Sequence, residues 1–357
     1  MTHSTRARTG ITSRGGPTVL GWDIGGVNTK AALLTGAEPG IRAIARPYEV
    51  QREPHALVPL LRGMAAELGA DAETPHAVTM TAELSQVFRT KREGVGFVLD
   101  AVEAAFPGGA IHAYTVHGEF LTPAEARARP LEVAASNWAA TAAYVARLVP
   151  DALLIDIGTT STDIIPIRGG AVTPSGTTDP ARLRSGELVY TGALRTPAEA
   201  VAREVPLWGA TASVSADGFA LIGDAHLWLG TLAPEDYTVA APDGRPASRE
   251  FAGERLARVV CADRDMLDDA AIDAIARALA EAQVRSVTEA IAKVRRRAPG
   301  IEIAVVTGLG EFIATEAARR AGLGVLPLRE RLGAAARTAP AACVAALLAA
   351  ATAGRPG

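Results

Sequence analysis

The sequence predicts an α/β protein with two domains, and three observations lead to this fold class. The chain has 357 residues, about twice the size of a typical domain. Segments with the apolar spacing of strands alternate with segments that have the spacing of helices. The third observation is a repeat, because LGWDIGGVNTKAALL at 20–34 and LLIDIGTTSTDIIPI at 153–167 share the pattern D-I-G-x-x-x-T. Two related segments, one in each half, indicate two halves with a shared task.

The boundary between the halves is predicted at Pro150 and Asp151, which break the pattern of the chain. We expect a disordered leader, a first domain, a second domain with an insertion at about 187–260, and a C-terminal helix with a tail. Their predicted ranges are 1–16, 17–150, 151–340 and 341–357.

Composition limits the partners and the compartment. With 21% charged residues and a net charge of -3, the chain lacks the basic excess of a nucleic-acid binder. Cys261 and Cys343 are far apart, so neither a disulfide framework nor a zinc site is expected, and a reducing cytoplasm fits best. The leader has no apolar core, and the longest apolar stretch, 341–351, is shorter than the roughly 20 residues that span a bilayer. We therefore expect no membrane partner; a homo-oligomer is left open.

The first half is predicted to open with a hairpin. The apolar runs 18–24 and 28–34 flank Gly25, Gly26 and Asn28, which is the pattern of two strands with a tight turn. The following segments predict a helix, a strand, a helix, a strand and a helix interrupted at Pro130. Their ranges are 55–70, 76–84, 94–106, 110–116 and 123–149.

The second half is predicted to open with the same hairpin. A stretch rich in glycine, proline and threonine follows at 168–186 and is expected to be loop. A long amphipathic helix is predicted from Asp265 to about Arg297, with Asp263 or Asp265 as its N-cap. Residues 301–312 then predict a strand, a glycine turn and the start of another helix.

The chemistry of the hairpins indicates a phosphate site. Glycines in a turn let backbone N–H groups approach an anion closely, because no Cβ is in the way. The aspartate before the turn cannot contact phosphate directly, since two negative charges about 4 Å apart repel by about 4 kcal/mol at an effective dielectric constant of about 20. Mg²⁺ removes this conflict, and it usually takes one or two carboxylates plus phosphate oxygens. We therefore predict that Asp23 and Asp156 hold Mg²⁺ from opposite walls of one site.

The other residues of the two turns are predicted to bind phosphate through backbone N–H groups and side-chain donors. They are Gly25, Gly26, Asn28, Thr29, Lys30, Gly158, Thr159, Thr160, Ser161 and Thr162. A single hairpin of this type is also explained as a tight turn, and Lys30 also fits the edge of a strand. The repeat is what favours one shared site.

Paired D-I-G-x-x-x-T hairpins that open two α/β halves resemble the phosphate motifs of the superfamily of actin, the Hsp70 chaperones and the sugar kinases. The resemblance implies a two-domain actin-like ATPase (ribonuclease H-like) fold with an interdomain cleft. VVTGLGEF at 305–312 lies where that superfamily has a glycine turn for the nucleotide, which adds Gly308 and Gly310 to the phosphate-binding candidates. Leu309 separates the usual paired glycines, and this departure counts against ordinary ATP binding. A dinucleotide site is disfavoured because the third glycine and the ribose-binding acid are missing.

Four segments closely resemble the hydantoinase/oxoprolinase-like proteins linked to tetrahydromethanopterin-dependent one-carbon transfer. They are TMTAELSQVFRTKREGV, AASNWAATA, DIGTTSTDIIPI and RLRSGELVYTGALRTP, at 79–95, 134–142, 156–167 and 182–197. The resemblance covers nearly the whole chain after the leader and implies a transferase of methanofuran-type cofactor biosynthesis. In the implied reaction, an aminomethylfuran-methanol diphosphate condenses with the phenol of tyrosine or a tyramine derivative, forming an ether and releasing diphosphate. The implied partners are these small-molecule substrates.

This chemistry needs fixed positive charge for the diphosphate. Arg89, Lys91 and Arg92 follow the strand that ends in TMTAEL and are candidates for this role. Arg92 is preferred because it abuts the helix predicted from Gly94. The alternative for all three is a solvated basic turn before a helix.

The reaction also needs a general base for a phenol with an ordinary pKa of about 10. Glu83, at the end of a strand, and Glu187, after a glycine turn, are the two candidates, and a surface carboxylate or helix cap is the other interpretation of each. Asp163 is a third candidate for the base or for the metal. The residues predicted to bind or orient the acceptor are Arg184, Arg195 and Asn137, although Asn137 beside Trp138 also fits an ordinary buried pair.

Two alternatives to the ether-forming enzyme stay open from the residues. An ATP-dependent small-molecule kinase would use the same hairpins and would need an adenine pocket around Gly308 and Gly310. A non-catalytic nucleotide-binding regulator would bind a ligand without turnover.

Overall fold

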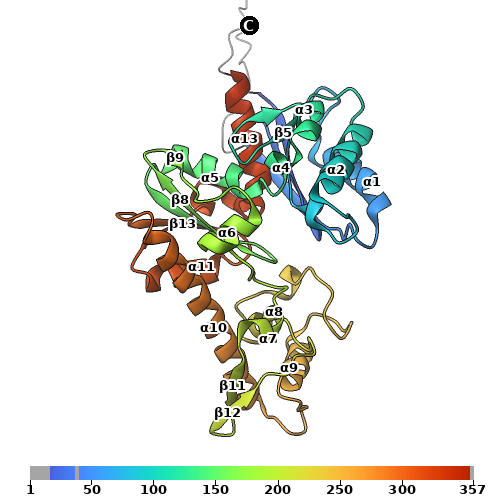
Figure 1. Ribbon diagram of the computed structural model, residues 1–357. Coiled ribbons are helices and arrows are strands. Elements are labelled where there is room, and N and C mark those ends of the chain that lie inside the picture. The colour runs from blue at the N-terminus through green and yellow to red at the C-terminus, as the bar shows by residue number, and fades with distance from the viewer. Residues whose placement is uncertain (1–16, 37–39, 354–357) are drawn as a thin grey trace, which may run out of the picture.

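The computed structural model describes residues 17–36 and 40–353, so the predicted leader at 1–16 lies outside the described residues. Two mixed sheets, each flanked by helices, form the body of the molecule, and a smaller subdomain extends from the second one (Figure 1). The α/β prediction is confirmed.

The first sheet has the strand order β3-β2-β1-β4-β5-β6. Its strands are β1 (Val19–Ile24), β2 (Asn28–Leu34), β3 (Ile41–Pro47), β4 (His76–Met80), β5 (Ile111–Tyr114) and β6 (Phe120–Leu121). β1 pairs antiparallel with β2, as a hairpin requires, and parallel with β4. The helices α1 (Leu57–Leu68) and α2 (Lys91–Ala105) cover one face of this sheet and share a hydrophobic core with it.

The second sheet repeats this arrangement. Its order is β10-β8-β7-β13-β14, with β9 added to β8. The strands are β7 (Ala152–Ile157), β8 (Thr162–Arg168), β9 (Ala171–Val172), β10 (Leu188–Val189), β13 (Ile303–Thr307) and β14 (Gly324–Pro327). β7 pairs antiparallel with β8 and parallel with β13, so the repeated motif forms the same hairpin beside the same parallel neighbour. The helices α10 (Asp269–Arg295) and α11 (Glu311–Arg320) pack on its outer face.

Two helices fill the space between the sheets. α5 (Asn137–Leu148) follows the first sheet and packs on the second, whereas α13 (Ala339–Ala353) follows the second sheet and packs on β1, β2 and β4 of the first. One hydrophobic core joins both helices to both sheets. The helical run Arg329–Ala353, which includes α12 (Arg329–Leu332) and η4 (Gly333–Thr338), is apolar and long enough to cross a membrane, but 78% of its most apolar window is buried inside the protein. This burial is typical of a core helix.

The contact between β1 and α13 depends on a glycine. A Cβ at Gly21 would lie 2.0 Å from the carbonyl oxygen of Ala341 and 2.9 Å from the Cβ of Ala345. We therefore expect Gly21→Ala to lower the free energy of unfolding by about 1–3 kcal/mol or more, because the backbones must separate. Urea denaturation measures this change. Gly63→Ala is the matched control in α1, where a Cβ meets nothing within 4 Å, so a gain of about 0.5–1 kcal/mol is expected. Equal losses in both variants would contradict the prediction.

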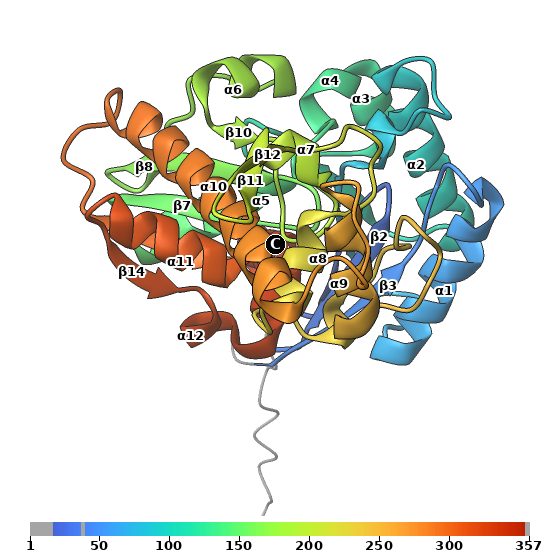
Figure 2. The same cartoon turned by 90° about the horizontal axis from the view of Figure 1, so that it is seen from below.

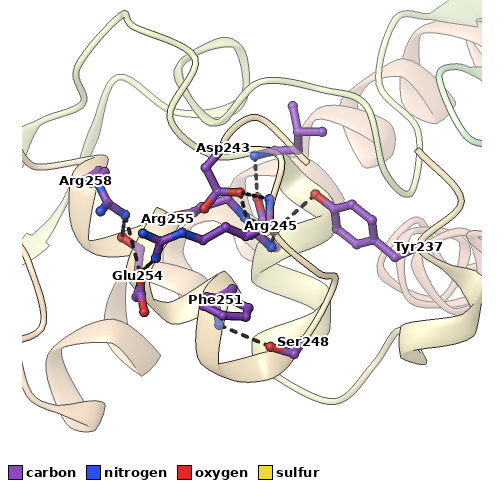
Figure 3. A network of polar contacts seen from close by, with 10 residues as sticks. Tyr237, Asp243, Arg245, Ser248, Phe251, Glu254, Arg255 and Arg258 are labelled. Carbon is purple, nitrogen blue, oxygen red and sulfur yellow. Dashed lines mark hydrogen bonds and ion pairs between the residues drawn. The ribbon is translucent and has the colours of Figure 1, made fainter. Parts of the chain in front are cut away.

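The subdomain leaves the second sheet after β10 and returns through α10. It contains α7 (Ala198–Val201), the hairpin β11 (Glu204–Leu207) and β12 (Ala210–Ser213), α8 (Ile222–Trp228), η3 (Pro234–Asp236) and α9 (Arg249–Arg258), and it lies at the bottom of Figure 1. Its centre is the buried Arg255, which donates to Asp224 at 2.9 and 2.7 Å and to Asp243 at 3.1 Å (Figure 3). Tyr237 donates to the same Asp224 oxygen. This network fixes the loop between α8 and α9, which has little regular structure of its own.

Several predicted elements differ from the structure. The stretch 168–186 is not all loop, since Thr178 and Pro180 start the helix α6 (Asp179–Ser185). The interrupted helix at 123–149 is three helices, α3 (Pro123–Ala128), α4 (Pro130–Val133) and α5, because the proline and the positive φ of Ala135 break it twice. The strand at 76–84 ends at Met80 and is followed by the turn η2 (Ala82–Leu84), and η1 (Pro54–Ala56) precedes α1.

Two predicted boundaries also shift. Asp268 caps α10 by accepting from the N–H of Ala271, whereas Asp263 accepts from the N–H groups of Asp265 and Met266 in the preceding turn. The predicted insertion at 187–260 begins later, because Leu188–Val189 pairs with β8 as part of the sheet.

Candidate functional site

The turns of the two hairpins have the same geometry and face each other. The N–H of Gly25 donates to the carbonyl of Asn28 at 3.0 Å, and the N–H of Gly158 donates to the carbonyl of Ser161 at 3.0 Å. The side-chain amide of Asn28 donates to the hydroxyl of Thr159 at 3.4 Å across the domain boundary. A Cβ at Gly25 would lie 2.6 Å from the Asn28 carbonyl, so the tight turn requires glycine there. The sequence repeat is therefore a spatial pair.

Each hairpin places a charged pair beside its turn. Asp23 lies opposite Lys30, and Asp156 occupies the equivalent position opposite Asp163. The Lys30 ammonium is 3.0 Å from Oδ2 of Asp23, and all three aspartates are buried. Burial alone would lower the pKa of Lys30, but Asp23, Asp156 and Asp163 outweigh it and raise the pKa. One lysine thus lies in the field of three carboxylates that come from both domains.

Asp156 also has a perturbed carboxyl group. Burial raises the pKa of its carboxyl to about 7, and the negative charges of Asp163 and Asp23 add to the effect, while Lys30 opposes it. Within residues 17–36 and 40–353, Asp156 has no ion pair of its own. A positive charge placed beside this carboxylate would therefore be strongly favoured.

Glu83 forms the first domain's side of the site. It lies in η2, directly after β4, and its side chain is fully buried. Gly94 allows this position, because a Cβ there would lie 2.5 Å from Cα of Glu83. Burial raises the pKa of Glu83 to about 7, although the ammonium of Lys91, 3.4 Å from Oε1, lowers it in part. Lys91 also pairs with Asp179 of α6 at 2.6 Å, which links the two domains.

Arg182 completes the second domain's side. This buried residue pairs with Asp163 at 2.5 Å, approaches Asp179 to 3.8 Å and lies over the ring of Trp138 at 4.4 Å. Charges of alternating sign therefore run across the boundary in the order Glu83, Lys91, Asp179, Arg182 and Asp163. Figure 2 shows α6 on the side of the second domain that is nearest α3 and α4 of the first.

Buried polar atoms without a hydrogen-bond partner are concentrated at this boundary. Most of those found in the described ranges belong to it: Oδ1 of Asp23, Oγ1 of Thr29, both carboxylate oxygens of Glu83, Oγ of Ser136, Nε1 of Trp138 and Nε of Arg182. An unsatisfied buried group costs about 1–3 kcal/mol, so such a cluster is unusual in a site that serves only stability. The cluster therefore indicates a ligand-binding site.

The predicted phosphate-binding residues lie near the boundary, but not all have free donors. The hydroxyl of Thr162 is fully buried and donates to the carbonyl of Thr191 at 2.6 Å, so it supports the loop after β10. Gly25, Gly26, Asn28, Gly158, Thr159, Thr160 and Ser161 are partly accessible. Gly308 and Gly310 pack against β7. A Cβ at Gly308 would lie 2.4 Å from Oδ1 of Asp156, and a Cβ at Gly310 would lie 2.4 Å from Cγ2 of Ile157. Their close contacts with β7 account for both glycines.

Three predicted residues lie outside the charged cluster. Arg92 and Arg184 are exposed, because the phase of each helix turns the neighbouring basic residue, Lys91 or Arg182, inward. Glu187 is buried, but its carboxylate accepts from the N–H of Ser175 at 2.7 Å on a different side of the strand pair. The structure therefore corrects the sequence preference for Arg92 over Lys91 and does not place Glu187 as a base beside Asp156.

The remaining predicted residues lie at the margins. Arg195 is exposed, but its backbone N–H donates to the carbonyl of Thr159, so its backbone lies beside the turn of the second hairpin. Asn137 is half-buried at the start of α5, beside Trp138. Sequence reasoning missed Arg182 and Ser136; Thr178 and Pro180 signal the start of α6, but not which of its arginines is buried.

A cavity of about 650 Å³ lies apart from this cluster. It is an open pocket lined by residues of α8, α10 and α11, with His226 and Phe312 among them, and none of the predicted site residues lines it. We assign the candidate site to the charged boundary because the unpartnered polar groups lie there.

The fold and the facing hairpins place the chain among two-domain proteins of the actin-like ATPase fold. A nucleotide-free structure of acetone carboxylase superposes with a TM-score of 0.59 and 13% identity, over 92% of this chain and 70% of that one. The model of the hydantoinase/oxoprolinase family matches residues 75–351. The chain belongs to the hydantoinase/oxoprolinase family.

Two curated relatives share one name. The "(4-{4-[2-(gamma-L-glutamylamino)ethyl]phenoxymethyl}furan-2-yl)methanamine synthase" of Methanocaldococcus jannaschii is 38% identical over 300 residues, which cover 84% of this chain and 88% of that protein. The synthase of the same name from Methanococcus vannielii is 33% identical over 186 residues, covering 51% of this chain and 82% of that protein. These relatives are enzymes, and the family predicted from sequence is confirmed.

Proposed function

We propose that this protein is a transferase of methanofuran-type cofactor biosynthesis. Its reaction joins an aminomethylfuran-methanol diphosphate to the phenol of tyrosine or a tyramine derivative and releases diphosphate. The observation that carries the proposal is Glu83, a buried carboxylate at the boundary between the two facing turns. Neither of its oxygens has a hydrogen-bond partner among the described residues, and one of them lies 3.4 Å from the ammonium of Lys91. The names of the two methanogen relatives support it.

In the proposed step, the bond between the furfuryl carbon and the diphosphate oxygen breaks, and a bond from that carbon to the phenol oxygen forms. The diphosphate leaves with the bonding electron pair. The phenol proton moves to Glu83, whose raised pKa makes it a stronger base than an exposed glutamate. Backbone N–H groups of the two turns, with Lys30 and Lys91 nearby, would stabilise the leaving diphosphate.

The aspartates of the hairpins fit a bound Mg²⁺. Among the described residues, Oδ1 of Asp23 is buried without a hydrogen-bond partner and Asp156 forms no ion pair, while burial raises the pKa of Asp156 to about 7. The described residues contain no cluster of three or more acidic, histidine or cysteine side chains arranged for a metal. A pair of carboxylates nevertheless suits Mg²⁺, which takes few protein ligands and completes its shell with water and phosphate. Bound there, Mg²⁺ would neutralise charge on the diphosphate.

The test is incubation of the protein with aminomethylfuran-methanol diphosphate, Mg²⁺ and either tyrosine, tyramine or γ-glutamyl-tyramine. Mass spectrometry is expected to show an ether, together with one diphosphate released for each ether formed. The preferred phenol identifies the acceptor. No ether with any phenol, together with ATP consumption and a phosphorylated product, would replace the proposal by a small-molecule kinase. Ligand binding without any turnover would replace it by a regulator.

A further inference from the structure

A small polar cavity lies behind the strand pair β8–β10, away from the charged boundary. Its volume is about 230 Å³, and its lining includes Glu187, Arg168 and Arg297. Asp163 on β8 interacts with Arg182, whereas Glu187, just before β10, interacts with Ser175 and lies 3.9 Å from Arg297. The cavity is therefore separate from the proposed active site.

Glu187 leaves an unsatisfied acceptor in this cavity. Its side chain is fully buried, Oε1 accepts from the N–H of Ser175 at 2.7 Å, and Oε2 has no hydrogen-bond partner among the described residues. A buried carboxylate oxygen without a donor is costly, and nothing in the proposed reaction uses it. A ligand that brings a hydrogen-bond donor would remove this cost.

The cavity also contains positive charge that Glu187 does not neutralise. Arg168 is half-buried and forms no ion pair in the part of the chain that the structure describes. Arg297 is held in place by Ser175, Ser185 and the carbonyl of Lys293. A lone cation would leave Arg168 unpaired, and a lone anion would leave Oε2 of Glu187 unsatisfied.

We propose that this cavity binds a small zwitterionic α-amino acid. The ammonium group donates to Glu187, and the carboxylate accepts from Arg168, with Arg297 adding a favourable field. Pro166, Val294 and Ala298 form an apolar wall beside these groups, which leaves room for a short side chain. The cavity volume of about 230 Å³ is several times the roughly 30 Å³ that one water takes in the liquid. The cavity therefore has room for a molecule of several heavy atoms. This proposal does not depend on the reaction proposed above.

Isothermal titration calorimetry of the full-length protein tests the proposal with glycine, L-alanine, L-serine and L-glutamate. At least one amino acid is expected to bind, at least about 10-fold more tightly than methylammonium or acetate, because each of these satisfies only one side of the cavity. Glu187→Gln and Arg168→Gln should each weaken binding by about 10- to 100-fold. Arg296→Gln is the control, since Arg296 is an exposed arginine at the C-terminal end of α10, next to the cavity residue Arg297. This variant should bind normally.

Several results would overturn the proposal. One is the absence of binding by all four amino acids at millimolar concentration. Another is methylammonium binding as tightly as glycine and unaffected by Arg168→Gln, which would define a cation site instead. Unchanged amino-acid affinity in Arg168→Gln would also refute the proposal. Because Arg168 is only half-buried, Arg168→Gln is expected to fold and to test the proposal even if Glu187→Gln does not fold.

Discussion

Glu83→Gln is expected to lower the rate of ether formation by about 10²- to 10⁴-fold, the range usual for loss of a general base. Glutamine keeps the shape of the side chain but cannot accept the phenol proton. The acceptor affinity should change little, so the loss appears in kcat. Glu289→Gln, an exposed glutamate on α10, is the control and should retain the full rate.

The pH dependence gives a second measurement of the same role. The base acts in its ionised form, and the pKa of Glu83 is about 7. At saturating Mg²⁺, which would hold Asp156 ionised, the rate should therefore rise with pH up to about 7, level off above it, and fall about tenfold for each pH unit below it. Lys91→Met removes the nearby ammonium that favours ionisation, so this variant should move the acidic limb to higher pH. A limb that persists unchanged in Glu83→Gln would rule out Glu83 as the base.

Asp156→Asn is expected to reduce the rate by at least about 10²-fold while making the metal-free protein more stable at pH 7.5. The loss of rate follows from removing one of the two carboxylates proposed to hold Mg²⁺. The gain in stability has a separate cause, because the folded protein must ionise a buried carboxyl whose pKa is raised to about 7. That raised pKa makes the ionised form unfavourable by up to about 4 kcal/mol relative to the unfolded chain.

Thermal unfolding with and without Mg²⁺ separates the two effects. Mg²⁺ should raise the melting temperature of the wild-type protein and should have little effect on Asp156→Asn or Asp23→Asn. If Asp156→Asn keeps a near-normal Mg²⁺-dependent rate, the carboxylate does not hold the metal. If it melts below the wild type without Mg²⁺, Asp156 serves the fold and its burial is compensated by contacts that asparagine cannot make.

The hairpins could be predicted because their signals are local. A turn such as that of Gly25 and Asn28 needs glycine for its own backbone, and the strands beside it follow from apolar runs. The repeat then predicted that Asp23 and Asp156 occupy equivalent positions, and the strand registers place them so. The hairpins also indicated the actin-like superfamily, whereas the family followed from four segments between residues 79 and 197.

The choice among neighbouring charged residues could not be predicted. Lys91 and Arg92, like Arg182 and Arg184, differ by one or two positions on a helix, and only packing decides which side chain is buried. Glu83, at a strand end, and Glu187, after a glycine turn, were equal candidates for the base, but the two side chains lie in different surroundings. Such choices depend on the angle at which each element meets its sheet.

By itself, the sequence determined the duplicated hairpin turns and the carboxylates that flank them, because these depend on spacing within about 15 residues, and its longer patterns determined the fold class and the family. Only the tertiary structure decided that α5 and α13 each pack on the other domain's sheet, as the close approach at Gly21 permits. That exchange brings the hairpins together and joins Lys91 to Asp179. Packing within each domain places Glu83 against Gly94 and Asp156 against Gly308, and burial is the largest cause of their raised pKa values, which no local pattern encodes.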